Sequence, residues 1–181
     1  MLNVAVRLVR SFFVSLSVAL VGMVLLALLA IAAFALVYGR RSGFLRLRFK
    51  VAQPVKMTLN LIKLFLFPAL VEELIFRVML LPHPTEKLPT GRWLAWAALS
   101  VGLFVIYHVI FSWVRPQARA VLSDRRFLVI VTWVGLILAV LYGLTGSLLA
   151  VTVVHWVVVA SWLYGFGGLE RLQGRVPDGA T

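Results

Sequence analysis

One apolar stretch, FPALVEELIFRVMLL at positions 67–81, contains the side chains of the chain that are best suited to chemistry. Glu72, Glu73 and Arg77 lie within six positions there, and almost every other residue is apolar. A charged side chain at the centre of a membrane-spanning helix costs about 2.5–3.5 kcal/mol on insertion scales. Such residues therefore face a bundle interior or a wet cavity, and they need partners.

Helical spacing divides these three charges into a pair and a single carboxylate. Glu73 and Arg77 are four residues apart, so they share one face of a helix and can form an ion pair. Glu72 points about 100° away from Glu73, which leaves it without a local partner. The purely structural interpretation is a self-neutralising Glu73–Arg77 pair, with Glu72 as an additional hydrogen-bond acceptor beside it.

Two histidines extend the candidate site. His108 is the only Asp, Glu, Lys, Arg or His residue of the apolar segment 93–114, and His155 is the only one of the last apolar segment. Each alone is explained as a core histidine. Together with Glu72 they suit general-base catalysis, in which a carboxylate takes a proton from water and imidazoles orient the water or stabilise an oxyanion. The same three residues are also an alternative zinc ligand set, although no HExxH helix is present.

Composition indicates that the elements positioning these residues are membrane-spanning helices. Of the 181 residues, 62% are hydrophobic and 13% are charged, against about 45–50% and 25% in soluble domains. The net charge of +12 lies in short stretches between apolar runs, which is typical of cytoplasmic membrane loops and argues against a nucleic-acid partner. The chain has no cysteine, which excludes disulfides and a cysteine-ligated metal site.

The apolar segments predict an all-α integral membrane protein, a compact bundle of about five transmembrane helices. The first segment is too long for a secretory signal and predicts an uncleaved helix. Residues 127–164 are too long for one span, so YGLTG at 142–146 predicts a hairpin. Pro68 predicts a kink in the second segment. The five segments are 11–38, 57–81, 93–114, 127–142 and 145–164.

The loops differ in their content of lysine and arginine. Twelve of these residues lie in 39–56, in 115–126 and in the C-terminal tail, and four lie on the opposite side. This asymmetry predicts the N-terminus outside and the C-terminus in the cytoplasm. We expect an N-terminal helix with a basic linker (1–56), a four-helix catalytic core (57–164) and a polar, frayed tail (165–181). The linker is either an amphipathic stretch on an anionic membrane surface or a solvated loop.

Three motifs resemble those of the CAAX-protease and bacteriocin-processing family, also called Abi or CPBP proteins. EELIFR at 72–77 is similar to the family's EExxxR motif, and FVIYH at 104–108 is similar to its FxxxH motif. HWVVV at 155–159 lies where the HxxxN motif is expected. Order and approximate spacing agree across residues 67–164. The resemblance implies a glutamic-type intramembrane endopeptidase. Because the chain has no disulfides and no removable signal is predicted, we expect it in a plasma membrane or a thylakoid-like inner membrane.

The resemblance also implies roles for individual residues. Glu72 would activate the attacking water with His108 as its partner, and His155 would help to bind the oxyanion. The supporting motif residues are Glu73, Arg77 and Phe104. No cofactor is implied, and zinc on Glu72, His108 and His155 stays an alternative. The expected partners are membrane lipids and a membrane-associated peptide or protein substrate.

One position departs from the family pattern. The third-motif asparagine is Val159 here, and valine cannot donate a hydrogen bond. Loss of one oxyanion donor costs about 10²–10³ in rate in a well-studied hydrolase, and Trp156, Ser161 or Tyr107 are substitute donors. The alternative function is a weak or inactive membrane partner, such as an immunity factor or a subunit of a membrane complex. A proton or ion carrier is a third candidate, but the inverted repeat of transporters is absent.

Overall fold

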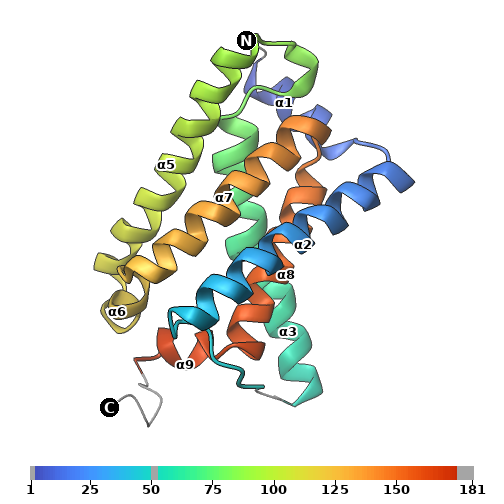
Figure 1. Cartoon of the computed structure of the whole chain (residues 1–181). Coiled ribbons are helices and arrows are strands. Elements are labelled where there is room, and N and C mark those ends of the chain that lie inside the picture. Colours follow the sequence, from blue (N-terminus) through green and yellow to red (C-terminus); the bar gives the residue numbers. More distant parts are fainter. Residues whose placement is uncertain (1–2, 50–52, 175–181) are drawn as a thin grey trace.

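The computed structural model describes residues 3–49 and 53–174, and within these ranges it is helical without any β-strand (Figure 1). Four of the described helices are long and apolar enough to cross a membrane. They are α2 (Val18–Arg41), α5 (Thr90–Val114), α7 (Arg125–Thr145) and α8 (Leu148–Gly165). The all-α membrane bundle predicted from the sequence is confirmed, and the orientation of its ends stays a prediction.

The N-terminal apolar segment forms two helices, so the single helix predicted at 11–38 is wrong at its beginning. α1 (Val4–Phe12) ends before a non-helical stretch at 13–17, and α2 begins at Val18. The Ser17 side chain accepts a hydrogen bond from the backbone N–H of Leu20 at 3.1 Å. A serine in this position satisfies one of the free N–H groups of a helix start, and this cap explains the new beginning.

The segment that carries the three charges is broken near its middle. Its pieces are α3 (Pro54–Leu64), η1 (Phe65–Leu70), α4 (Val71–Glu73) and η2 (Leu74–Met79). Phe67 has non-helical dihedrals, φ −146° and ψ 119°, directly before Pro68. The proline ring disfavours helical backbone at the preceding residue. The kink predicted at Pro68 is therefore confirmed, and it takes the form of a break between two helical pieces.

The remaining spans agree with the predicted segments to within a few residues. α7 begins at Arg125 because the Asp124 side chain caps it, accepting from the backbone N–H of Arg126 at 2.8 Å. The predicted hairpin break is confirmed at Gly146, which ends α7 with a left-handed φ of 65°. Ser147 then caps α8. A positive φ favours glycine because it has no Cβ.

Figure 1 shows α7 crossing the middle of the bundle, with α5 on one side and α2 on the other. α8 packs against α7, α2 and the charged segment. The centre between these elements is apolar and fully buried, and it includes Val78, Leu138, Tyr142, Val151 and Val154. Charged side chains next to such a core have no access to bulk water, so they must find partners inside the protein.

Short elements close the two ends of the bundle. η3 (Pro84–Glu86) follows the charged segment near α1, while η4 (Pro116–Ala118) and α6 (Arg119–Leu122) follow α5. Figure 1 places α1 and α6 at opposite ends of the molecule. The loop after η3 therefore lies at the same end as α1, far from the basic loops.

The basic linker and the tail meet at the end of α8. The backbone N–H of Arg48 donates to the carbonyl of Gly165 at 2.9 Å, and Phe44 is buried while Phe49 is 81% exposed. α9 (Gly168–Leu172) packs on α8, so the frayed tail predicted from position 165 is wrong over these residues. These residues bury apolar surface against α8 and the linker, which explains why they form a helix and are not frayed. Residues 50–52 of the linker and 175–181 of the tail lie outside the described residues.

Candidate active site

Glu73 and Arg77 form the ion pair expected from their spacing. Arg77 Nε lies 3.3 Å from Glu73 Oε2, and both side chains are fully buried. The contact lacks hydrogen-bond geometry, so it is an ion pair held by charge. The other carboxylate oxygen, Oε1, lies 2.8 Å from His155 Nδ1. Glu73 therefore neutralises Arg77 and at the same time binds the histidine of the third motif.

Arg77 connects the charged segment to two membrane helices. Its Nη1 donates to Ser100 Oγ on α5 at 3.2 Å, and its Nη2 donates to the carbonyl of Gly135 on α7 at 3.4 Å. The guanidinium carbon also lies 5.0 Å from the ring centroid of Phe104. A buried guanidinium needs such partners for its donors. Sequence reasoning missed Ser100 and Gly135, because neither stands out in an apolar helix.

His155 lies between the two glutamates. A carboxylate only accepts hydrogen bonds, so His155 Nδ1 donates to Glu73 and its Nε2 faces Glu72. Nε2 and Glu72 Oε2 are 3.7 Å apart, which is too long for a direct hydrogen bond. Glu72 Oε2 is buried and has no hydrogen-bond partner in the described part of the chain. The carboxylate that the sequence left without a local partner therefore lies opposite an imidazole 83 residues away.

Phe104 explains the spacing of the second motif. Its carbonyl accepts a hydrogen bond from His108 Nδ1 at 2.8 Å, one turn later on α5. Its ring is packed edge-on against His108, with centroids 4.7 Å apart, and against His155, with centroids 5.9 Å apart. Phe104 thus fixes the tautomer and direction of His108, whose Nε2 remains available as an acceptor.

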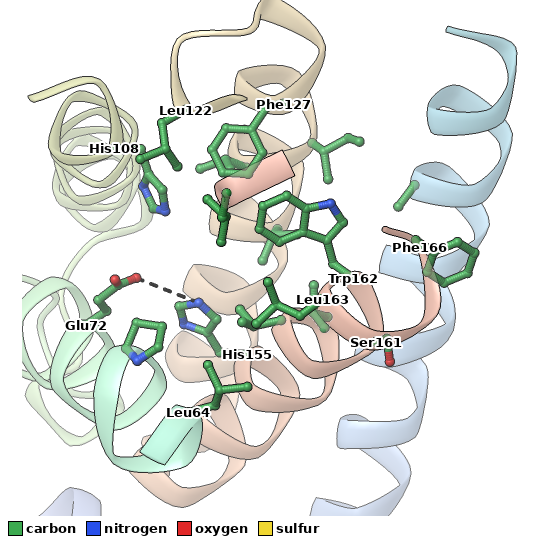
Figure 2. A pocket seen from close by; sticks show the side chains of 18 of the residues that line it. Leu64, Glu72, His108, Leu122, Phe127, His155, Ser161, Trp162, Leu163 and Phe166 are labelled. Carbon is green, nitrogen blue, oxygen red and sulfur yellow. Dashed lines mark ion pairs between the residues drawn. The ribbon is translucent and has the colours of Figure 1, made fainter. Parts of the chain in front are cut away.

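The three residues open into one large cavity. Its volume is about 930 Å³ and its walls are mainly apolar. Figure 2 shows Glu72, His108 and His155 converging at one end of it. The walls come from α2, α5, α7 and α8 and include Ile31, Phe111, Phe127, Val131 and Val158. The cavity has room for an extended apolar ligand beside the polar group.

Among the substitute oxyanion donors named from the sequence, two are poorly placed. Trp156 Nε1 donates to the carbonyl of Leu61 at 2.9 Å and is therefore occupied. Ser161 is exposed, and Figure 2 shows it turned away from Glu72. Tyr107 lines the cavity, and its hydroxyl interacts with the Glu72 carboxyl. Val159 also lines the cavity, where it offers only methyl groups.

The alternative zinc set gains no support from the arrangement of ligands. In the residues that the structure describes, no group of three or more His, Cys, Asp or Glu side chains is placed to hold a metal ion. His155 also uses Nδ1 for Glu73, and His108 uses Nδ1 for a carbonyl. Of the candidate ligand atoms in these three residues, the Nε2 atoms of His108 and His155 and the Glu72 carboxylate are the ones that face the cavity.

Comparison with known proteins identifies the family. The family model described as type II CAAX prenyl endopeptidase Rce1-like matches residues 54–161, which is more than half of the chain and includes all the motif residues discussed above. Searches of curated proteins and of solved structures returned no match. The match confirms the resemblance stated from the three motifs. The chain therefore belongs to the type II CAAX prenyl endopeptidase Rce1-like family, and it is an integral membrane protease of the CAAX type.

Proposed function

We propose that this protein hydrolyses a peptide bond of a membrane-associated substrate, with Glu72 as the general base. The single observation that carries the proposal is the environment of Glu72. The residue is only 5% exposed, one oxygen of its carboxylate has no hydrogen-bond partner among the described residues, and it borders the cavity. A buried carboxylate aimed into a cavity next to imidazoles is suited to taking a proton from water.

His155 contributes through its charge and its fixed orientation. Glu72, Glu73 and Arg77 together carry one net negative charge when ionised, which a protonated His155 would neutralise. Its Nδ1–H is held by Glu73 at 2.8 Å, so Nε2–H of the imidazolium points toward Glu72 and the cavity. A positive donor held in this place stabilises negative charge that develops on a substrate carbonyl oxygen.

The reaction then follows from these positions. His108 Nε2 accepts one hydrogen bond from the attacking water, and Glu72 takes a proton as the water oxygen bonds to the carbonyl carbon. The carbonyl electrons move to oxygen, where His155 donates a hydrogen bond. Glu72 then gives the proton to the amide nitrogen as the C–N bond breaks. The products are a carboxylic acid, which keeps the second proton of the water until it ionises in solvent, and a free amine, and Glu72 is ionised again.

Tyr107 is the donor that we propose in place of the missing third-motif asparagine. Val159 cannot donate, Trp156 is occupied by the Leu61 carbonyl and Ser161 faces away. The Tyr107 hydroxyl borders the cavity beside His108 and interacts with Glu72. A phenolic O–H is a competent oxyanion donor when it is preorganised at the reacting carbonyl.

A prenylated C-terminal tail is the substrate that we propose. The family description names CAAX prenyl endopeptidases, and a cavity of about 930 Å³ with apolar walls suits a long hydrocarbon chain. We place the reaction in the plasma membrane or a thylakoid-like membrane, among membrane lipids. The proposed catalytic core is 57–164, and α2 supplies a further wall of the cavity.

Cleavage of a prenylated reporter peptide by the purified protein in liposomes tests the base directly. Glu72→Gln keeps the size of the side chain and removes its basicity, so we expect the rate to fall at least about 10²-fold. Glu170→Gln is the matched control, because Glu170 pairs with Arg48 at 3.2 Å on the surface. Equal cleavage by wild type and Glu72→Gln would remove Glu72 from the mechanism.

Chelation tests whether the base acts without a metal ion. We expect the rate to be unchanged after treatment with a strong zinc chelator, because Glu72 takes the proton itself. Loss of activity that zinc restores would instead make Glu72, His108 and His155 a ligand set.

Val159 favours a second candidate function, a membrane partner that has lost catalysis. In that case the buried charges serve only to hold the bundle, and Glu72→Gln keeps biological activity in a complementation assay. A null phenotype for Glu72→Gln with normal protein levels argues against this second function.

A further inference from the structure

Trp162 is a polar group of the cavity that the proposed reaction does not use. Its indole Nε1 is buried and donates to no acceptor in the part of the chain that the structure describes. The side chain lines the same cavity as Glu72, and Figure 2 shows its ring in the middle of the cavity wall. A buried indole N–H ordinarily has an acceptor, so an unpaired one in a ligand cavity indicates a donor kept for the ligand.

Two other tryptophans show what is unusual about this one. Trp133 Nε1 donates to the carbonyl of Ala30 at 3.1 Å, and Trp156 Nε1 donates to the carbonyl of Leu61 at 2.9 Å. Both bind helix backbone from a neighbouring element. The indole N–H of Trp162 has no such use, although it lies on the same helix as that of Trp156.

The ring of Trp162 is held firmly in place. It is stacked on Phe44, with centroids 6.4 Å apart, and it is tilted against Phe127, with centroids 5.4 Å apart. A Cβ added at Gly168 would lie 2.6 Å from the ring, so the indole packs directly on backbone at that position. Because the ring cannot easily turn, the direction of its N–H is preorganised for binding.

Helix geometry gives the distance from Trp162 to the reacting centre. His155 and Trp162 are seven residues apart, so they lie on nearly the same face of α8 and about 10.5 Å apart along its axis. An extended peptide advances about 3.3 Å per residue. A substrate chain bound along α8 would therefore bring an oxygen about three residues from the cleaved bond to the indole N–H.

We propose that Trp162 binds an oxygen acceptor of the substrate, a backbone carbonyl or a terminal carboxylate, about three residues from the cleaved bond. The inference rests on the proposed function and assigns a register-setting contact to the same cavity. Positive charge lies near this part of the wall: the guanidinium carbons of Arg171 and Arg126 lie 4.9 and 6.0 Å from the centroid of Phe44, and Arg126 is paired with Asp124 at 2.7 Å, which leaves the charge of Arg171. A carboxylate and a carbonyl oxygen are both favoured in that field.

Trp162→Phe is the variant that tests this contact, because it keeps an aromatic ring and removes the N–H. It also makes the side chain smaller, a change that the Trp156→Phe control shares. We expect KM for a prenylated reporter peptide to rise about tenfold, kcat to change little, and the cleavage position to become mixed by mass spectrometry. Trp156→Phe is the matched control, since it removes an N–H that serves the backbone of α3. An unchanged KM and a single unchanged cleavage position in Trp162→Phe would overturn the proposal.

A binding measurement in the Glu72→Gln background separates this inference from the proposed function. A dye-labelled prenylated peptide should bind Glu72→Gln about tenfold more tightly than Glu72→Gln/Trp162→Phe by fluorescence anisotropy. Equal binding overturns the role of Trp162 even if Glu72 proves essential. Full cleavage activity of Glu72→Gln overturns the proposed base, and the Trp162 comparison then still reports on the contact.

Peptides that differ only at the C-terminus distinguish the two kinds of acceptor. If the terminal carboxylate binds the indole N–H, amidation of the peptide weakens binding to the protein with Trp162 and leaves binding to Trp162→Phe unaffected. If an internal carbonyl binds, amidation changes neither, and Trp162→Phe weakens both peptides equally. Either result supports the contact, and no effect of Trp162→Phe on any peptide contradicts it.

Discussion

The structure contains two buried arginine–glutamate pairs, Arg7–Glu86 and Arg77–Glu73, and they have different roles. Arg7 Nε lies 2.7 Å from Glu86 Oε1, and Arg7 Nη2 donates to Oε2 at 3.2 Å. Arg77 Nε lies 3.3 Å from Glu73 Oε2, and this contact lacks hydrogen-bond geometry. The second oxygen of Glu73 binds His155. We call the first pair closed because both carboxylate oxygens of Glu86 contact the guanidinium of Arg7. In the second pair, one oxygen of Glu73 is directed to the imidazole of a histidine at the cavity.

The surroundings of the Arg7–Glu86 pair are structural. Arg7 Nη1 donates to the carbonyl of Met79 at the end of η2, and Glu86 accepts from the backbone N–H of His83 at 2.8 Å. The pair therefore fastens α1 and η3 to the charged segment. The Arg7–Glu86 pair thus holds structural elements together, whereas the Arg77–Glu73 pair orients a reactive histidine. What differs is the third residue that the carboxylate binds: a backbone N–H for Glu86, and the imidazole of a cavity histidine for Glu73.

The largest effect is expected when the supporting pair is broken. Glu73→Gln removes the anion that holds His155 and leaves Arg77 buried with less compensation, which costs about 3–5 kcal/mol of stability in comparable pairs. We also expect the rate per folded molecule to fall about 10³-fold, because the imidazole loses its orientation and charge partner. Cleavage of the reporter peptide and thermal unfolding in detergent measure the two effects.

The loss of stability and the loss of rate in Glu73→Gln together show whether the two ion pairs differ in role. If Glu73→Gln lowers stability and leaves the rate per folded molecule unchanged, the role of Glu73 is purely structural, like that of Glu86. Arg77→Lys serves as the control, because it keeps the positive charge and loses the contacts with Ser100 and Gly135.

Tyr107→Phe is expected to lower the rate by about 10²-fold, with little change in stability. The variant removes the hydroxyl proposed as oxyanion donor and keeps the ring that packs on Phe76 with centroids 5.5 Å apart. A drop in kcat with constant KM, measured with the reporter peptide, is the expected result. Introducing asparagine in Val159→Asn should restore part of the lost rate in the double variant. Full activity of Tyr107→Phe alone would assign the oxyanion to another donor.

Breaking the closed pair should affect stability alone. Arg7→Met leaves Glu86 buried without its guanidinium, and we expect a loss of about 3 kcal/mol in the free energy of unfolding. The rate per folded molecule should stay within about twofold of wild type, because this pair does not reach the cavity. The double variant Arg7→Met/Glu86→Met should recover part of the stability. A large loss of rate in stably folded Arg7→Met would show that both pairs support the site.

Helix spacing was enough to predict the parts of the site that are local in sequence. The Glu73–Arg77 pair follows from an i,i+4 separation, and His108 reaches back to Phe104 for the same reason. The hairpin at Gly146 and the break before Pro68 follow from backbone restrictions of single residues. These features needed no knowledge of which helices are neighbours.

Contacts between distant segments were not predictable in this way. Arg7 is one of the four basic residues that the sequence places in loops on the side opposite the basic linker, yet it is 2% exposed, because α1 packs on η2 and Arg7 binds Glu86 of η3. His155 reaches Glu73 only after the break at Phe67 and the turn at Gly146 set the helices side by side. The sequence shows that Trp162 lies seven residues after His155. However, an aromatic residue at that spacing in an apolar helix ordinarily indicates core packing.

The smallest expected effect is a pH dependence of stability at His83, near the Arg7–Glu86 pair. Burial lowers the pKa of His83, and the nearby Arg10 and Arg7 lower it further while Glu86 opposes them. The His83 ring nitrogen Nδ1 accepts a hydrogen bond from the backbone N–H of Thr85 at 3.3 Å, which protonation at that atom would break.

The sign of this effect follows from the unfolded state, where a histidine binds a proton near pH 6.5. Because the folded protein resists that proton, stability should fall as the pH drops below about 6.5, by at most about 1.4 kcal/mol per pH unit. Denaturation of wild type and His83→Asn between pH 5 and 8 measures the slope, which should be smaller in the variant. The Asp124 carboxyl, whose pKa Arg126 lowers by hydrogen bonding, loses its contribution only below about pH 4 and therefore does not interfere. Equal slopes in both proteins would mean that His83 is not the group whose titration changes the stability.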